Sequence, residues 1–130
     1  MKFKSKMVPA IVAAFALGAV AVEGIHAQSK AKPLVYYIAE VDVTNKEAYA
    51  KEYVPRAVAA TKAASGRFLA LGGKVTVLDG EPPKARVVVQ VWDSIEAIQA
   101  WRNSKDFKEA RKIGEKYAKF RTYAVEGVSQ

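Results

Sequence analysis

Residues 34–47 read LVYYIAEVDVTNKE, and this stretch decides the fold. Its first part, residues 34–41, is rich in β-branched and aromatic residues, which is typical of a strand. Thr44 and Glu47 then have the spacing of a capping box, with Thr44 as the helix cap. The stretch therefore predicts a strand that leads directly into a helix.

Helical spacing of apolar and aromatic residues continues from Tyr49 to a stop signal at Gly66. Pro55 interrupts this run because it lacks the N–H that would bond back to residue 51, so we expect a kink or two short helices. Residues 67–78 read as a long strand with a bulge or bend at Gly72 and Gly73.

The second half of the chain repeats this alternation of strands and helices. Residues 85–92, ARVVVQVW, predict a third strand. Ser94 and Ser104 predict the caps of two helices, and Phe107, Ala110 and Ile113 begin an apolar stripe on the second of them. Residues 121–128 read as the last strand.

The order β-α-β-β-α-β predicts a ferredoxin-like α+β fold, a four-stranded antiparallel sheet with helices on one face. Residues 34–38 and 87–89 are apolar on both faces, although a sheet covered on one side should alternate apolar with polar residues. The second face therefore needs a cover. The simplest cover is the same face of another copy, so we expect a homodimer in which two sheets close into a barrel.

Residues 1–27 have the order of a secretory signal peptide: three lysines, an uncharged apolar run at 7–22, and a candidate cleavage site after Ala27. The alternative is a retained membrane anchor, but the run is shorter than the roughly 20 residues of a spanning helix. We therefore expect a cleaved peptide at 1–27, a tether at 28–33, a domain at 34–128, and a periplasmic or secreted product. Without a cysteine at the cleavage site, the product would not be a lipoprotein.

Composition excludes several kinds of chemistry. The 130 residues allow one domain, the net charge is +8, and there is no cysteine. The one histidine, His26, lies in the expected signal peptide. The working chain would then lack histidine and thiol nucleophiles, histidine-bound haem and histidine-ligated transition metals. No Asp-x-Asp cluster suggests a Ca²⁺ or Mg²⁺ site, so we expect no metal and no cofactor.

Four blocks in fixed order carry a resemblance to a known family: SGRFLALGG at 65–73, LDG at 78–80, RVVV at 86–89 and AWRNS at 100–104. Together they resemble the domain of unknown function 1330 family over residues 34–127. The resemblance implies a dimeric α/β barrel of ferredoxin-like subunits and no established activity. The wider superfamily includes small monooxygenases, isomerases, haem enzymes and many binding proteins. The family often has arginine where this chain has Leu71, Glu-Phe-Pro-Ser where it has VWDS at 91–94, and tyrosine where it has Arg102.

Strand alternation suggests a pocket inside the expected barrel. It places Tyr36 with Glu40 on one face, Gln90 with Trp92, and Glu126 with Ala124. We expect the polar members to point into the barrel, where a small-molecule site would be lined by Tyr36, Glu40, Gln90, Trp92 and Glu126. The catalytic candidates are Glu40, Glu126 and Tyr36, since a desolvated carboxylate can act as a general base. The alternative is that the carboxylates reach solvent and pair with Arg67, Arg86 or Arg121.

For each of two groups of basic residues, the sequence allows both a functional and a purely structural interpretation. Arg67 and Arg86, at the starts of adjacent strands, could clamp an anion or pair with Asp42, Asp79 or Glu81. Five lysines recur at helical spacing and form either a solvated face or a weak contact with an anionic membrane surface: Lys105, Lys108, Lys112, Lys116 and Lys119. The export signal and the lack of a binding motif argue against nucleic acid.

The sequence thus favours an exported domain that binds a small, partly apolar molecule. One alternative is a cofactor-independent enzyme of the isomerase or monooxygenase kind, acting through a barrel carboxylate or tyrosine. Another is a non-catalytic interaction protein of the cell envelope. An open cavity without a carboxylate would favour binding, one with a carboxylate of raised pKa would favour catalysis, and a filled barrel would favour the interaction protein.

Overall fold

The structure is a computed structural model, and it describes residues 32–129. The expected signal peptide at 1–27 and the tether residues 28–31 lie outside the described residues. Within the described range, no helix combines the length and the apolar character needed to cross a membrane. One compact unit, Pro33–Val128, holds all the elements discussed below.

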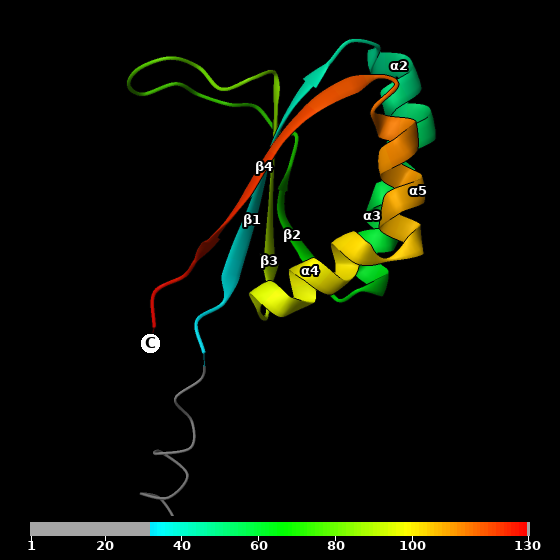
Figure 1. Cartoon of the computed structure of the whole chain (residues 1–130). Coiled ribbons are helices and arrows are strands. Elements are labelled where there is room, and N and C mark those ends of the chain that lie inside the picture. The colour runs from blue at the N-terminus through cyan, green and yellow to red at the C-terminus, as the bar shows by residue number, and fades with distance from the viewer. Residues whose placement is uncertain (1–31, 130) are drawn as a thin grey trace, which may run out of the picture. The chain divides into compact units, whose positions relative to one another are not determined.

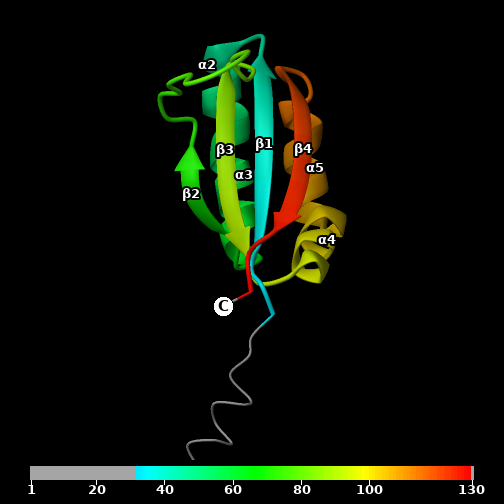
Figure 2. The same cartoon turned by 90° about the vertical axis from the view of Figure 1, so that its left-hand side faces the viewer.

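Four strands form one antiparallel sheet in the order β2-β3-β1-β4 (Figure 2). The bounds are β1 Val35–Val43, β2 Arg67–Leu71, β3 Arg86–Trp92 and β4 Ala118–Glu126. β1 lies in the middle and pairs with β3 on one side and β4 on the other. This order is ferredoxin-like, so the α+β fold expected from the sequence is confirmed.

The helices lie together on one face of the sheet, and Figure 1 shows the other face bare in the described chain. They are α2 Lys46–Ala48, a π-helical turn η1 Tyr49–Tyr53, α3 Val54–Ala63, α4 Ile95–Asn103 and α5 Lys105–Gly114. The sheet and this helical layer enclose the hydrophobic core. Any site between the layers is therefore built from side chains of both.

The helix after β1 begins one residue later than the sequence predicts. Asn45 is the cap and its Oδ1 accepts a hydrogen bond from the Ala48 N–H at 3.1 Å. Thr44 donates instead to the Tyr117 carbonyl at 2.9 Å, so the predicted Thr44 cap is wrong. The helix is interrupted before Pro55, as expected, by the π-helical turn η1. Pro55 itself lies in the first turn of α3, where a missing N–H is tolerated.

The second strand is shorter than predicted. β2 ends at Leu71, and residues 72–85 form a long loop instead of continuing the strand. The bulge falls between Phe68 and Ala70 rather than at the glycine pair. Gly72 has φ +71°, which ends the strand in a conformation that favours glycine. The last strand, by contrast, starts three residues earlier than predicted, at Ala118.

Alternation along β1 determines which side chains enter the core. Val35, Tyr37, Ala39 and Val41 are buried and face the helices. They pack with Trp92 of β3 and Trp101 of α4 in one cluster. Ser94 and Ser104 cap α4 and α5 as predicted, with their hydroxyl oxygens accepting from the Ala97 and Phe107 N–H groups. Ser104 also follows the end of α4 that carries Trp101, and its hydroxyl donates to the Trp101 carbonyl at 2.6 Å.

The bare face of the sheet is largely apolar. The pairing register places Ile38 of β1 between Val89 of β3 and Tyr123 of β4 on this face. Tyr36 lies between Val91 and Val125 in the next row. Tyr123 and Val125 are exposed. The two-sided apolar character that the sequence indicates is therefore present in the sheet.

Candidate functional site

The single pocket expected from the sequence is divided between the two faces of the sheet. Tyr37 pairs with Gln90, so Gln90 shares the helix-facing side of Tyr37, and Trp92 is on that side too. Tyr36 and Glu40 point to the bare face. The prediction that these four side chains line one pocket is therefore wrong. Alternation fixes which residues of one strand share a face, but the register between strands decides which residues of the neighbouring strand lie on that same face.

Glu126 is also separated from the group. It pairs with Val35, on the helix-facing side of the sheet, but it lies at the last residue of β4 and is exposed. It therefore shares a face with Gln90 and not with Glu40. None of the three catalytic candidates, Tyr36, Glu40 and Glu126, lies in the enclosed space described below.

Glu40 forms an ion pair with Arg121, which is the alternative to a pocket carboxylate that the sequence analysis left open. Its carboxylate accepts a hydrogen bond from Arg121 of the neighbouring β4, and a second from the Tyr123 hydroxyl at 3.3 Å. Glu40 is itself largely shielded, whereas Arg121 is mostly exposed. These contacts give the carboxylate a structural role on the bare face.

Arg67 and Arg86 do not form a clamp. Because β2 and β3 are antiparallel, the starts of the two strands lie at opposite ends of the pair: Arg67 is opposite Val91, and Arg86 lies beyond Leu71. Arg67 forms an exposed ion pair with Asp93 at 3.4 Å, which is not among the partners expected. Arg86 instead faces the helices, where it meets the side chains described next.

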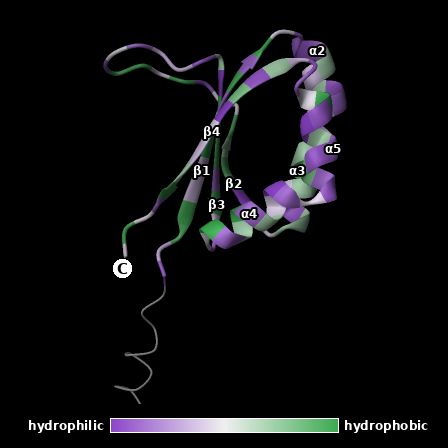
Figure 3. Ribbon diagram, viewed as in Figure 1, coloured by the Kyte–Doolittle hydropathy of each residue, from purple (hydrophilic) through white to green (hydrophobic). Residues whose placement is uncertain are grey.

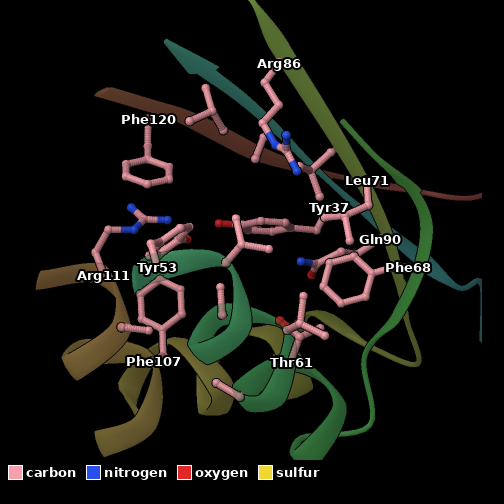
Figure 4. Close-up of a pocket in the computed structure, with 18 of the residues that line it drawn as sticks. Tyr37, Tyr53, Thr61, Phe68, Leu71, Arg86, Gln90, Phe107, Arg111 and Phe120 are labelled. Atoms are coloured by element: carbon pink, nitrogen blue, oxygen red, sulfur yellow. The ribbon is translucent and has the colours of Figure 1, made fainter. Parts of the chain in front are cut away.

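A cavity of about 50 Å³ lies between the helices and the sheet. Its walls are mostly apolar, and Figure 4 shows side chains entering it from both layers. The polar and aromatic side chains among its lining residues are Tyr37, Tyr49, Tyr53, Thr61, Phe68, Arg86, Gln90, Trp101, Phe107, Arg111 and Phe120. No acidic residue is among the described residues that line it.

Two arginines bring positive charge to this cavity from opposite layers (Figure 4). Arg86 comes from β3, and its guanidinium lies 5.5 Å from the centre of the Tyr49 ring. Arg111 comes from α5 and packs over Phe120 at 4.0 Å and Phe107 at 4.9 Å. Both guanidinium groups therefore pack on aromatic rings, whereas the usual partner of a buried arginine is a carboxylate.

Every buried side-chain nitrogen or oxygen that lacks a hydrogen-bond partner, within the part of the chain described, belongs to a residue of this cavity. The three atoms are Arg86 Nε, Arg111 Nε and Trp101 Nε1, and all three are N–H donors. Leaving one such donor unpaired costs about 1–3 kcal/mol. The cavity therefore holds three unpaired N–H donors, and its described lining residues offer hydroxyl oxygens but no charged acceptor.

Two tyrosines from η1 add hydroxyl groups to the same wall. Burial raises the pKa of Tyr49, and the charges of Arg86 and Arg111 oppose that rise. Burial raises the pKa of Tyr53 to about 12, against the opposing charge of Arg111. Both phenols are therefore protonated at neutral pH and do not neutralise the two guanidinium groups.

Gln90 is fixed on the cavity wall by its neighbour. Its Oε1 accepts a hydrogen bond from Trp92 Nε1 at 2.8 Å, and Gln90 is only 5% exposed. Because the oxygen is engaged with an indole, which can only donate, the amide group has a defined orientation. The NH₂ of Gln90 then points into the cavity (Figure 4). This adds another donor to the same space.

Aromatic rings pack against one another in and behind the wall of the cavity. Trp101 packs edge-on against Tyr37 at 5.1 Å and against Phe107 at 4.7 Å, and it lies 4.8 Å from Trp92. Arg102 donates to the Tyr37 hydroxyl at 2.7 Å. These contacts hold the Tyr37 ring in the wall.

Sequence reasoning missed Arg111, Tyr49 and Tyr53 as site residues. The tyrosines were visible as core positions of a helix, because they have helical spacing. Arg111 follows Phe107 by four residues, so it lies on the same face of α5 as the apolar stripe. A basic residue within the apolar stripe of α5 was the one sequence feature that could have indicated Arg111 as a site residue.

The lysine stripe does not stay on one helix. α5 ends at Gly114, so Lys116 lies in the following turn and Lys119 in β4. All five lysines are exposed, and Figure 3 shows hydrophilic residues along α5. Lys105 pairs with Glu109 at 3.9 Å. A weak contact of these lysines with an anionic membrane surface stays a prediction.

In the described range, no group of three or more Asp, Glu, His or Cys side chains comes together. The cavity itself is unsuitable for a cation, because two arginines line it and no acidic residue is among its described lining residues. The geometry instead suits a ligand that brings hydrogen-bond acceptors.

Comparison with known proteins gives one family match. The family described as domain of unknown function (DUF1330) matches residues 34–128. A comparison with curated proteins finds no match.

Several solved structures share the fold. A protein of unknown function from Rhodopseudomonas palustris has a TM-score of 0.62 at 15% identity, covering 85% of this chain and 94% of that one. SnoaB, a cofactor-independent oxygenase from Streptomyces nogalater, has a TM-score of 0.52 at 14% identity, covering 75% of this chain and 96% of SnoaB. A putative antibiotic biosynthesis monooxygenase from Chloroflexus aurantiacus has a TM-score of 0.50 at 18% identity, covering 75% and 95%. At these identities the likeness establishes the fold alone.

Proposed function

The chain belongs to the DUF1330 family of domains of unknown function, and we propose that it binds a small, partly apolar molecule in the cavity between its helices and its sheet. One observation carries this proposal: all the unpaired buried side-chain donors of the described residues belong to residues that line that one apolar cavity. An apolar space with a few converging polar groups is the usual form of a small-molecule site.

Binding is favoured over catalysis by the groups that line the cavity. None of the described lining residues is acidic, and the two tyrosines of η1 are protonated at neutral pH. The cavity therefore has no general base of the kind that an isomerase would use. A cofactor-independent enzyme remains the second candidate, supported by the shared fold with SnoaB.

We also propose that two copies pack through the bare sheet face. The supporting observation is the apolar surface formed by Tyr36, Ile38, Val89, Tyr123 and Val125. The loop at 72–85 extends to the same side of the sheet (Figure 1), and it exposes Val75, Val77 and Leu78, the last at 88%. A second copy would cover both surfaces at once.

Export is proposed on the sequence of residues 1–27 alone. The charged, apolar and small-residue regions follow the order that a signal peptidase requires. The intact mass of the protein recovered from the producing cell tests this proposal. Loss of residues 1–27 supports it, whereas a full-length mass in a membrane fraction supports the retained anchor.

Native mass spectrometry of the protein purified from its own cell tests ligand binding. We expect a small molecule to remain with the folded protein and to be released on unfolding. Ala57→Leu, which fills the cavity wall, should reduce retention, and Ala59→Leu on the exposed side of α3 should not. Equal retention in both variants would place the ligand elsewhere, and a folded protein without any ligand would count against the proposal.

A further inference from the structure

We infer that the cavity binds the carboxylate group of a small organic acid, held between Arg86 and Arg111. This inference rests on the proposed function and names the class of ligand. It starts from the character of the unpaired groups, which are N–H donors only. Donors that are buried without acceptors favour a ligand that supplies oxygen lone pairs.

The charge of the site favours an anion over a neutral acceptor. Arg86 lies 5.5 Å from the centre of the Tyr49 ring and Arg111 lies 4.0 Å from the centre of the Phe120 ring, so the two cations line one cavity from opposite layers (Figure 4). No described lining residue is acidic, and the aromatic rings that hold the guanidinium groups are only weak partners. A carboxylate would supply the missing negative charge.

The free edges of the guanidinium groups favour a planar anion. In each arginine, Nε is the unpaired atom, and Nε together with one Nη forms an edge that can hold both oxygens of a carboxylate. The Arg86 guanidinium also lies close to the backbone of Gly72, because a Cβ at Gly72 would lie 2.6 Å from its Nη1. A glycine at this position lets the backbone approach the guanidinium closely.

The size and lining of the cavity favour a short acid over an inorganic ion. A volume of about 50 Å³ accommodates a small head group, and the walls between the donors are valines, alanines and aromatic rings. Phosphate would present polar oxygens to these walls on every side, which costs desolvation. A short alkyl carboxylate places its oxygens on the arginines and its carbon atoms on the apolar wall.

Propionate and its neutral counterpart propionamide test the inference, because they differ in charge and hardly in shape. The readout is the ¹H–¹⁵N spectrum of the arginine Nε–H groups of the full chain, assigned with R86K and R111K. We expect propionate to shift the Nε–H signals of Arg86 and Arg111 and to bind at least about tenfold more tightly than propionamide. The Nε–H of Arg67, which lies outside the cavity and pairs with Asp93, serves as the internal control.

The outcomes separate this inference from the function it rests on. Equal binding of propionate and propionamide in the cavity would overturn the carboxylate assignment and leave a binding cavity. Shifts at Arg67 alone would overturn it as well, since they indicate a surface ion pair. Inorganic phosphate that shifts Arg86 and Arg111 as strongly as propionate would overturn the choice of an organic acid. If none of the three probes shifts a cavity arginine, both the carboxylate assignment and the proposed function lose support.

Substitution provides a second measurement. R111K keeps the charge but removes the Nε edge, so propionate should bind about tenfold or more weakly to the folded variant. R67K changes an arginine of the exposed surface in the same way and should bind as the unaltered protein does. Equal affinities of R111K and R67K would remove Arg111 from the site, and the spectrum of the unaltered protein stays decisive if R111K does not fold.

Discussion

Arg86 and Arg111 stand in opposite layers of the fold, on β3 and on α5, and each has a buried Nε without a partner at the same cavity. Unpaired buried donors are rare in folded proteins, and here two of the same kind belong to residues that line one cavity. The simplest physical account is that this space is built for an acceptor. The predictions below test the parts of that account separately.

The pKa of Tyr53 gives a prediction about stability at high pH. Its folded pKa is raised to about 12 from 10.0, chiefly by burial, so between those values the unfolded chain loses this proton while the folded protein keeps it. The free energy of unfolding should therefore fall as pH rises from about 10 to about 12, by up to about 3 kcal/mol. Urea unfolding at pH 9, 11 and 12 measures this fall.

Tyr53→Phe is the control for the pH prediction, because it removes the titrating hydroxyl and keeps the ring. Other groups also titrate in this range, so the difference between the two proteins is the quantity of interest. The unaltered protein should lose more stability than Tyr53→Phe above pH 10. Parallel curves for the two proteins would show that Tyr53 is not shielded by burial.

Gly66 gives a prediction about packing behind the cavity. A Cβ at this position would lie 2.7 Å from Trp92 Cε2 and 2.8 Å from Thr61 Cγ2, and both side chains are almost completely buried. Gly66→Ala should therefore destabilise the protein by about 1–3 kcal/mol in urea unfolding, as overpacking does. Gly73→Ala is the matched control, because a Cβ there meets nothing within 4 Å, and equal effects would contradict the packing described.

The bare sheet face gives a prediction about assembly. Ile38 lies at its centre, between Val89 and Tyr123, so Ile38→Asp would place a charge in the middle of the proposed interface. We expect a dimer for the unaltered protein and a folded monomer for Ile38→Asp, measured by light scattering after size exclusion. Lys108→Asp on the exposed side of α5 should stay dimeric. A monomeric unaltered protein would contradict the proposed packing.

The two carboxylates that the sequence offered as catalytic candidates should be dispensable for binding. Glu40 lies on the bare face and Glu126 is exposed at the end of β4, so neither reaches the cavity. Glu40→Gln and Glu126→Gln should leave the affinity for propionate unchanged within about twofold, in the same NMR titration. A tenfold loss in either variant would return that carboxylate to the site.

The fold could be predicted from the sequence because each element has a local cause. Strand composition, the serine caps at Ser94 and Ser104 and the proline at 55 act over a few residues, and all of them appear in the structure. The failure of the strand prediction at residues 72–78 also has a local origin. Val75 and Val77 alternate like a strand, but no neighbouring strand pairs with them, and both side chains are exposed.

The candidate site could not be predicted because it depends on distant pairings. The sequence shows that Tyr36 and Glu40 share a face, and the structure agrees. Only the pairing of Tyr37 with Gln90 reveals that Gln90 belongs to the opposite face. Arg111 was hidden for another reason, since basic residues on a helix usually face solvent, and here Phe107 and Phe120 hold one inside.

The location of the ligand is the central claim, and isotope-filtered NOE spectra of the labelled protein with unlabelled propionate test it most directly. The account predicts NOEs from the propionate methyl and methylene protons to the rings of Tyr49, Tyr53 and Phe120, which line the cavity between helices and sheet. NOEs to Tyr36, Ile38 or Tyr123 instead would place the ligand on the bare face of the sheet and contradict the account.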